Sequence, residues 1–122
     1  MRIAIPYRDG EVFLHFGRSE YFKLYDIENG EGVHEEIVAT DGVSHGALAV
    51  FLDDLDVSVV LCGGMGENMR SAMLKEGIEI YGGIRGDADD AAEDFIHGEL
   101  SYVYHQDKNS EQSTAACSHR FS

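Results

Sequence analysis

The chain is short of basic residues. Nine Lys and Arg stand against 23 Asp and Glu, which gives a formal net charge of −14 at pH 7. Because nucleic-acid binding depends on neutralising phosphates with Lys and Arg, this balance argues against it, and it argues equally against binding to anionic membrane surfaces. An anionic ligand would have to be held by local donors, since the overall field of the protein repels it.

Cysteine and long apolar runs are also scarce. The two cysteines, Cys62 and Cys117, are far apart and neither belongs to a CxxC pair. A structural disulfide and a self-contained zinc site of ordinary spacing are therefore disfavoured. No stretch approaches the length of a membrane-spanning helix, and residues 1–6 are too short for the apolar part of a secretory signal. We therefore expect a cytoplasmic protein that makes no use of membranes.

What the sequence does contain is a series of short apolar segments separated by turns. The expected strands are residues 2–6, 21–27, 33–39, 57–61 and 78–81, and the expected helices are residues 47–54, 67–76 and 88–97. This alternation predicts one α/β domain with a mixed five-stranded sheet in the order 3-2-1-4-5, counted along the chain, and helices on both faces. The domain would cover residues 1–105, and the polar residues 106–122 would form a flexible tail.

In this arrangement, four loops emerge at the same edge of the sheet, where open α/β sheets bind ligands. They carry His15, the pair Ser44-His45, Cys62 with its glycines, and the segment from Gly82 to Gly86, which includes Arg85. Neutral imidazole is a ligand for iron, copper and zinc, so His15 and His45 are candidate ligands. The alternative for each is a loop histidine that packs or bonds locally, and His45 could simply lie near the start of the first helix.

The segment Cys62-Gly63-Gly64-Met65-Gly66 stands between an expected strand and an expected helix. Glycines permit turns closed to other residues, and the free N–H groups of the helix's first turn would point at a ligand above the strand end. The helix N-terminus would lower the pKa of the Cys62 thiol and make it a soft ligand. The alternative is that Cys62 is a small buried hydrophobic residue. Met65 is either a core residue or a flap.

Other chemistries have weaker support. The glycine turn could hold a phosphate, but residues 63–67 lack the Lys and Ser/Thr of a P-loop, and no segment fits GxGxxG. No Ser-His-Asp or Cys-His motif of recognised spacing is present, so we expect no enzymatic activity. Near the C-terminus, Cys117-Ser118-His119 is either a mobile metal-handling pair or without function.

Several short motifs, taken in order, resemble those of one family. They are Ile3-Ala4-Ile5-Pro6, His15-Phe16-Gly17, Ser44-His45-Gly46, Cys62-Gly63-Gly64-Met65-Gly66 and Tyr81-Gly82-Gly83. Over about residues 1–104 the chain resembles the dinitrogenase iron-molybdenum cofactor biosynthesis family. The resemblance implies a ribonuclease-H-like three-layer fold without nuclease activity. It also implies a nitrogen-fixation accessory role in carrying or protecting metal–sulfur clusters, with His15 as a cluster contact and Cys117 and His119 as a sparse version of a Cys/His-rich tail.

The leading hypothesis is therefore reversible, non-catalytic binding of a metal–sulfur cluster that contains iron, with or without molybdenum. The expected partners are proteins that donate or accept the cluster, and the chain would be a monomer or a weak homodimer. The candidate binding residues are His15, Gly17, Arg18, Ser44, His45, Cys62, Gly63, Gly64, Met65, Gly66, Gly83 and Arg85, with His15 and Cys62 as metal ligands. Two alternatives stay open: a module for small molecules or nucleotide phosphates, and an acidic regulatory domain that binds other proteins.

Overall fold

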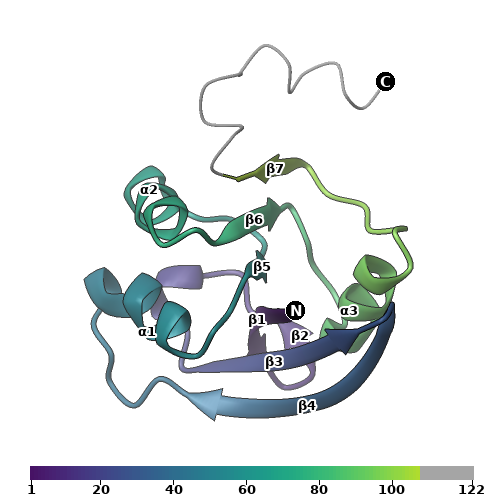
Figure 1. Ribbon diagram of the computed structural model, residues 1–122. Helices are drawn as coiled ribbons and strands as arrows, with labels where there is room; N and C mark the ends of the chain where they lie inside the picture. Colours follow the sequence, from purple (N-terminus) through teal and green to yellow (C-terminus); the bar gives the residue numbers. More distant parts are fainter. Residues whose placement is uncertain (108–122) are drawn as a thin grey trace.

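The computed structural model describes residues 1–107, which form a sheet with helices on both faces (Figure 1). The strands are β1 (Arg2–Arg8), β2 (Glu11–Val12), β3 (Tyr21–Glu28), β4 (Glu31–Ala39), β5 (Val59–Leu61), β6 (Glu79–Gly82) and β7 (Tyr104–Gln106). The helices are α1 (Leu48–Asp54), α2 (Glu67–Lys75) and α3 (Ala88–Ile96), with two 3₁₀ turns, η1 (Phe16–Arg18) and η2 (His45–Ala47).

The sheet is mixed and runs in the order β4-β3-β1-β5-β6-β7, with β2 paired to β1. β5 runs parallel to both β1 and β6, whereas the β1/β3, β3/β4 and β6/β7 pairs are antiparallel. The expectation of five strands is wrong, because the sheet has seven. The five expected strands follow one another along this path as anticipated, and β2 and β7 are additional. Both are too short to show a hydrophobic period.

The end of the expected domain also needs correction. Gln106 pairs with Ile80 in the β6/β7 ladder, so the sheet reaches one residue into the segment assigned to the tail. Most of that segment, including Cys117 and His119, lies outside the described residues.

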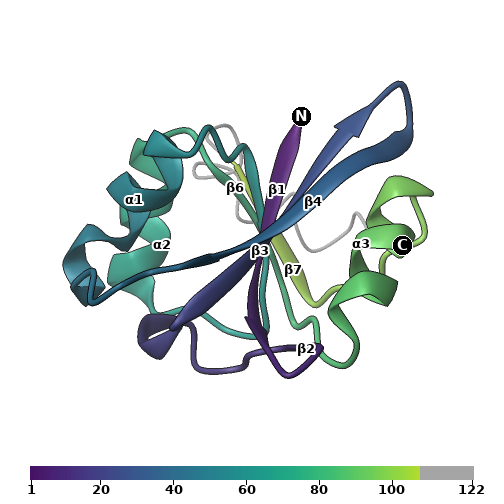
Figure 2. The same ribbon diagram turned by 90° about the horizontal axis from the view of Figure 1, so that it is seen from below.

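Three layers result from the alternation of side chains along the central strands. Ala4, Leu24 and Val60 point to the side on which α1 and α2 pack. Ile3, Ile5, Val59 and Leu61 point to the other side, against α3. Figure 2 shows the sheet between these two helical layers. None of the helices in residues 1–107 has the length and apolar character to cross a membrane.

Local signals in the sequence account for several element boundaries. Asn29 and Gly30 both adopt positive φ (52° and 77°) in the two-residue turn between β3 and β4, as Asn-Gly hairpins require. Gly77 has φ 80° just after α2, where a left-handed residue ends a helix. The side chain of Asp87 caps α3 by accepting a hydrogen bond from the Asp90 N–H at 2.9 Å.

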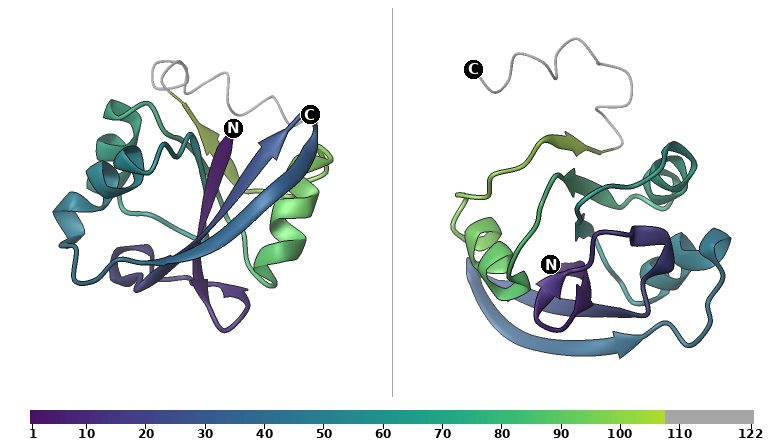
Figure 3. Two further views of the ribbon diagram at one scale, coloured as in Figure 1. Left: turned by 60° about the horizontal axis from the view of Figure 1, so that its bottom comes forward. Right: turned by 180° about the vertical axis from the view of Figure 1, so that it is seen from behind.

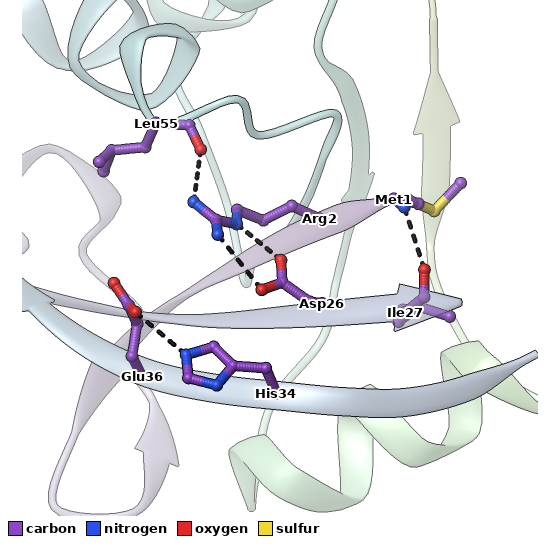
Figure 4. A network of polar contacts seen from close by, with 7 residues as sticks. All are labelled: Met1, Arg2, Asp26, Ile27, His34, Glu36 and Leu55. Atoms are coloured by element: carbon purple, nitrogen blue, oxygen red, sulfur yellow. Dashed lines mark hydrogen bonds and ion pairs between the residues drawn. The ribbon is translucent and has the colours of Figure 1, made fainter.

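A polar network fixes the start of β1 (Figure 4). The Arg2 guanidinium donates to both carboxylate oxygens of Asp26 on β3, at 2.7 and 3.2 Å, and to the Leu55 carbonyl after α1 at 2.8 Å. The bidentate hydrogen bond from Arg2 lowers the pKa of Asp26. The network joins β1, β3 and the end of α1 near the N-terminus, so it holds the frame on which the loops after β2, β4 and β5 are built.

Candidate functional site

Three loops that are distant in the sequence form one cleft of about 270 Å³. They follow β2, β4 and β5, and the first of them lies beside the start of α1 in both views of Figure 3. The cleft is lined by Leu14, His15, Phe16, Gly17, Arg18, His45, Gly64, Met65, Gly66 and Met69. The structure thus brings together seven of the candidates named from the sequence: His15, Gly17, Arg18, His45, Gly64, Met65 and Gly66.

Two imidazoles face this cleft from different loops. His15 precedes η1, and its carbonyl accepts a hydrogen bond from the Arg18 N–H at 2.8 Å. The His15 ring contacts Phe13 edge to face, with centroids 5.8 Å apart. His45 begins η2, and both histidines are exposed. Both rings are therefore accessible to a ligand.

Gly17 allows the His45 ring to rest on the backbone of the neighbouring loop. A Cβ atom added at Gly17 would contact His45 Cδ2 and would lie 2.6 Å from Nε2. Any larger residue at this position would push the imidazole away. This close approach explains why a glycine follows His15-Phe16, a requirement that a single sequence does not reveal.

The glycine turn after β5 is the third loop of the cleft, and it supplies backbone N–H donors. Gly66 is the N-cap residue of α2, and no side chain caps the helix there. A Cβ atom at Gly64 or at Gly66 would meet nothing within 4 Å, so the turn is open. The first-turn N–H groups of a nine-residue helix carry a partial positive charge that attracts anions.

A second and larger cleft, of about 770 Å³, lies on the other side of His15. It shares His15 and Arg18 with the first cleft. Its remaining lining residues are Tyr7, Arg8, Asp9, Phe13, Glu20, Tyr21 and Ile37. The Arg8 guanidinium lies 5.6 Å from the centre of the Phe13 ring. Sequence reasoning missed Arg8 because its place beside His15 depends on the β1–β2 pairing, which was not expected.

Cys62 differs from the prediction. It is fully buried among core residues of the α1/α2 layer and does not line the cleft. Burial raises the pKa of its thiol to about 12, despite opposing contributions from a hydrogen bond with Tyr104 and from the charge of Arg70. The expected lowering of this pKa is therefore wrong, since loss of hydration outweighs nearby favourable charges.

Neighbouring side chains close the turn over Cys62. Leu14 Cδ2 lies 2.7 Å from the position of a Cβ on Gly63. The Tyr104 ring contacts the corresponding position on Gly82, and Arg70 lies 5.3 Å from the centre of that ring. Tyr104 was missed because β7 was missed. With three residues, Tyr104–Gln106, β7 is too short to give a signal in the sequence.

The remaining candidates lie apart from the cleft. Gly83 and Arg85 line a different hollow of about 400 Å³, together with Asp87, Asp90 and Asp94. Val103 covers Gly83, which has φ 87°. Ser44 is exposed beside His45 but does not line the cleft. The structure therefore does not bring Gly83 and Arg85 into the cleft that holds His15 and His45.

Comparison with known proteins finds a matching family, a related sequence and similar solved structures. The family described as dinitrogenase iron-molybdenum cofactor (Nitro_FeMo-Co) matches residues 1–98. The uncharacterized protein MJ0580 of Methanocaldococcus jannaschii is 30% identical over 106 residues, covering 82% of this chain and 89% of that protein. The crystal structure of PH0822 is 36% identical with a TM-score of 0.80, covering 85% of this chain and 96% of that one. The apo form of the orange protein (ORP) from Desulfovibrio gigas is 25% identical with a TM-score of 0.71, covering 84% and 92%.

Proposed function

The chain belongs to the dinitrogenase iron-molybdenum cofactor family, and from this premise we propose that it binds an anionic metal–sulfur cluster in the cleft between His15 and His45. Binding is reversible and non-catalytic, and the protein acts as a carrier or protector of the cluster. The observation that carries the proposal is the meeting of two exposed imidazoles from separate loops at one cleft.

Imidazole nitrogen is a suitable ligand for iron and copper, so His15 and His45 would hold the metal atoms. Arg18 and the N–H groups at the start of α2 would donate hydrogen bonds to the sulfides. Each hydrogen bond to a charged group contributes roughly 1.5–3 kcal/mol. Two ligands and a few such bonds therefore give an affinity at which the cluster can still be released.

Two guanidinium groups lie at the candidate site of this protein, whose overall charge is −14, and the carboxylates of Asp9 and Glu20 border the larger cleft with them. Arg18 borders both the cleft and its larger neighbour, and Arg8 borders the larger one. A cluster too large for the first cleft would extend past His15 toward these two guanidinium groups. The two clefts therefore form a continuous candidate surface for an anion, with His15 at its centre.

The buried thiol changes one part of the earlier hypothesis. A thiol with a pKa of about 12 is protonated at physiological pH, and a metal would have to displace core packing to reach it. We therefore assign ligation to His15 and His45 and give Cys62 a packing role.

The finer points of the proposal follow the family description. The cluster would contain iron and sulfur, with or without molybdenum, and the partners would be cytoplasmic proteins of cofactor assembly that donate or accept it. The orange protein structure is that of an apo form, which implies a loaded form of that relative. The three-layer arrangement, with five strands in the order β4-β3-β1-β5-β6, supports the ribonuclease-H-like class.

The test is anaerobic reconstitution of the full-length protein with iron, sulfide and molybdate, followed by absorbance and metal analysis after desalting. We expect the wild-type protein to retain cluster absorbance and the H15A/H45A variant to lose it. The matched control is H34A/H97A, which removes two exposed histidines away from the cleft and should retain the cluster. A wild-type protein that never acquires a cluster, or an H15A/H45A variant that retains it fully, would refute the proposal.

A further inference from the structure

A second group of ligand-type side chains lies on the outer part of the sheet, away from the cleft. Glu79 begins β6, His105 lies in the middle of β7, and Asp107 follows β7 directly. One ligand atom from each lies within 4.8 Å of the other two, and His105 Nε2 is 3.2 Å from Glu79 Oε1. All three residues are half-buried.

Strand register explains why these three side chains meet. Tyr81 pairs with His105 and Ile80 with Gln106 in the antiparallel β6/β7 ladder. Continuing this register by one residue puts Asp107 opposite Glu79. Residues two apart share a face of a strand, so Glu79, His105 and Asp107 project from the same face.

The His105 ring is held in place by aromatic packing. It stacks on the Tyr81 ring with centroids 4.2 Å apart and an interplanar angle of 19°. The Tyr102 ring meets it edge to face, with ring centroids 6.3 Å apart. A ring held in this way keeps its Nε2 atom in one orientation. Folding has therefore already fixed the His105 side chain, and metal binding costs less side-chain conformational entropy.

The charges at this place favour a cation. Two carboxylates directly opposite each other on neighbouring strands repel. The other histidine–carboxylate pairs among the described residues, His34–Glu36 and His97–Glu93, are more exposed and include a single carboxylate each. Imidazole nitrogen combined with two carboxylate oxygens is a donor set for Zn²⁺ and related divalent ions.

We propose that Glu79, His105 and Asp107 form a binding site for one divalent first-row transition-metal ion, distinct from the His15–His45 cleft. Three protein ligands leave one position for water. The ion ties β7 to β6, and through β7 it holds Tyr104 against Gly82 and over Cys62. Its role is to secure the outer strand of the sheet.

The test is calorimetric titration of the full-length protein with ZnCl₂, which needs no cluster. We expect one Zn²⁺-binding event, and E79Q and H105A should each lower its affinity by at least about tenfold. The control is H34A, which disrupts a His–Glu pair without a third ligand and should leave the Zn²⁺ affinity unchanged. Zn²⁺ should raise the melting temperature of the wild-type protein but not that of E79Q.

Two further variants separate this site from others. H15A/H45A and C117S/H119A should both retain the event, and the Co²⁺-substituted protein should lack thiolate-to-metal charge-transfer absorption. If H105A does not fold, E79Q and D107N carry the comparison. Absence of Zn²⁺ binding at micromolar concentration, or equal affinity in wild type, E79Q and D107N, would overturn the proposal. Neither result bears on cluster binding at His15.

Discussion

The His15–His45 cleft and the Cys62 turn lie next to each other, yet glycines serve opposite purposes in them. At the cleft, Gly64 and Gly66 face open space and leave backbone donors accessible. Around Cys62, the space beside Gly63 and Gly82 is occupied by Leu14 and Tyr104. A glycine-rich segment therefore signals close approach of the backbone to something, and only the fold decides whether that is a ligand or a side chain.

The largest expected effect comes from the Cys62 turn, whose buried thiol makes the unfolding free energy of the protein depend on pH. Because the Cys62 pKa is about 12 in the folded protein and 9.0 ordinarily, its contribution to stability is complete below about pH 9 and is lost as the pH rises toward 12. The wild-type protein should therefore lose on the order of 2–4 kcal/mol more than C62A over this range. Urea unfolding of both proteins from neutral to alkaline pH measures this, and parallel profiles would contradict the buried thiol.

A second prediction tests the cover over Cys62. In G82A, the new Cβ meets the Tyr104 ring, so the variant should lose about 1–3 kcal/mol of unfolding free energy by overpacking, or else displace the ring. In a C117S background, displacement should speed the labelling of Cys62 by a thiol reagent. The control is G64A, whose added Cβ meets nothing within 4 Å and whose stability should change by less than about 0.5 kcal/mol. Equal stability and equal labelling in both variants would show that Tyr104 does not close this side.

The smallest effect on stability is expected at Gly17. G17A should displace the His45 ring, which is exposed, and should therefore change the unfolding free energy by less than about 0.5 kcal/mol. Cluster uptake should nevertheless fall several-fold, because the second imidazole leaves the cleft. G46A provides the control, since its Cβ would meet nothing within 4 Å. If G17A and G46A take up the cluster equally, the position of His45 is unimportant.

Local signals predicted much of the frame. A single sequence reveals signals that depend only on neighbouring residues. Examples are the apolar segments at residues 2–6 and 57–61, the Asn29-Gly30 turn and the capping residue Asp87. β2 and β7 have two and three residues, and they exist because the neighbouring strand offers them hydrogen-bond partners. Because these two strands were not predicted, the place of Arg8 beside His15 and that of Tyr104 against Gly82 were not predicted either.

The sequence by itself determined the mixed α/β architecture, because hydrophobic period and turn chemistry are local properties of the chain. It also indicated which loops would gather near one sheet edge, since crossover handedness leaves few topologies. Only the tertiary structure decided which side chains at that edge are open to a ligand. His15 and His45 are exposed, whereas Cys62 is buried beneath Leu14 and Tyr104, which reach it from distant segments. Burial is what sets the protonation state of this thiol.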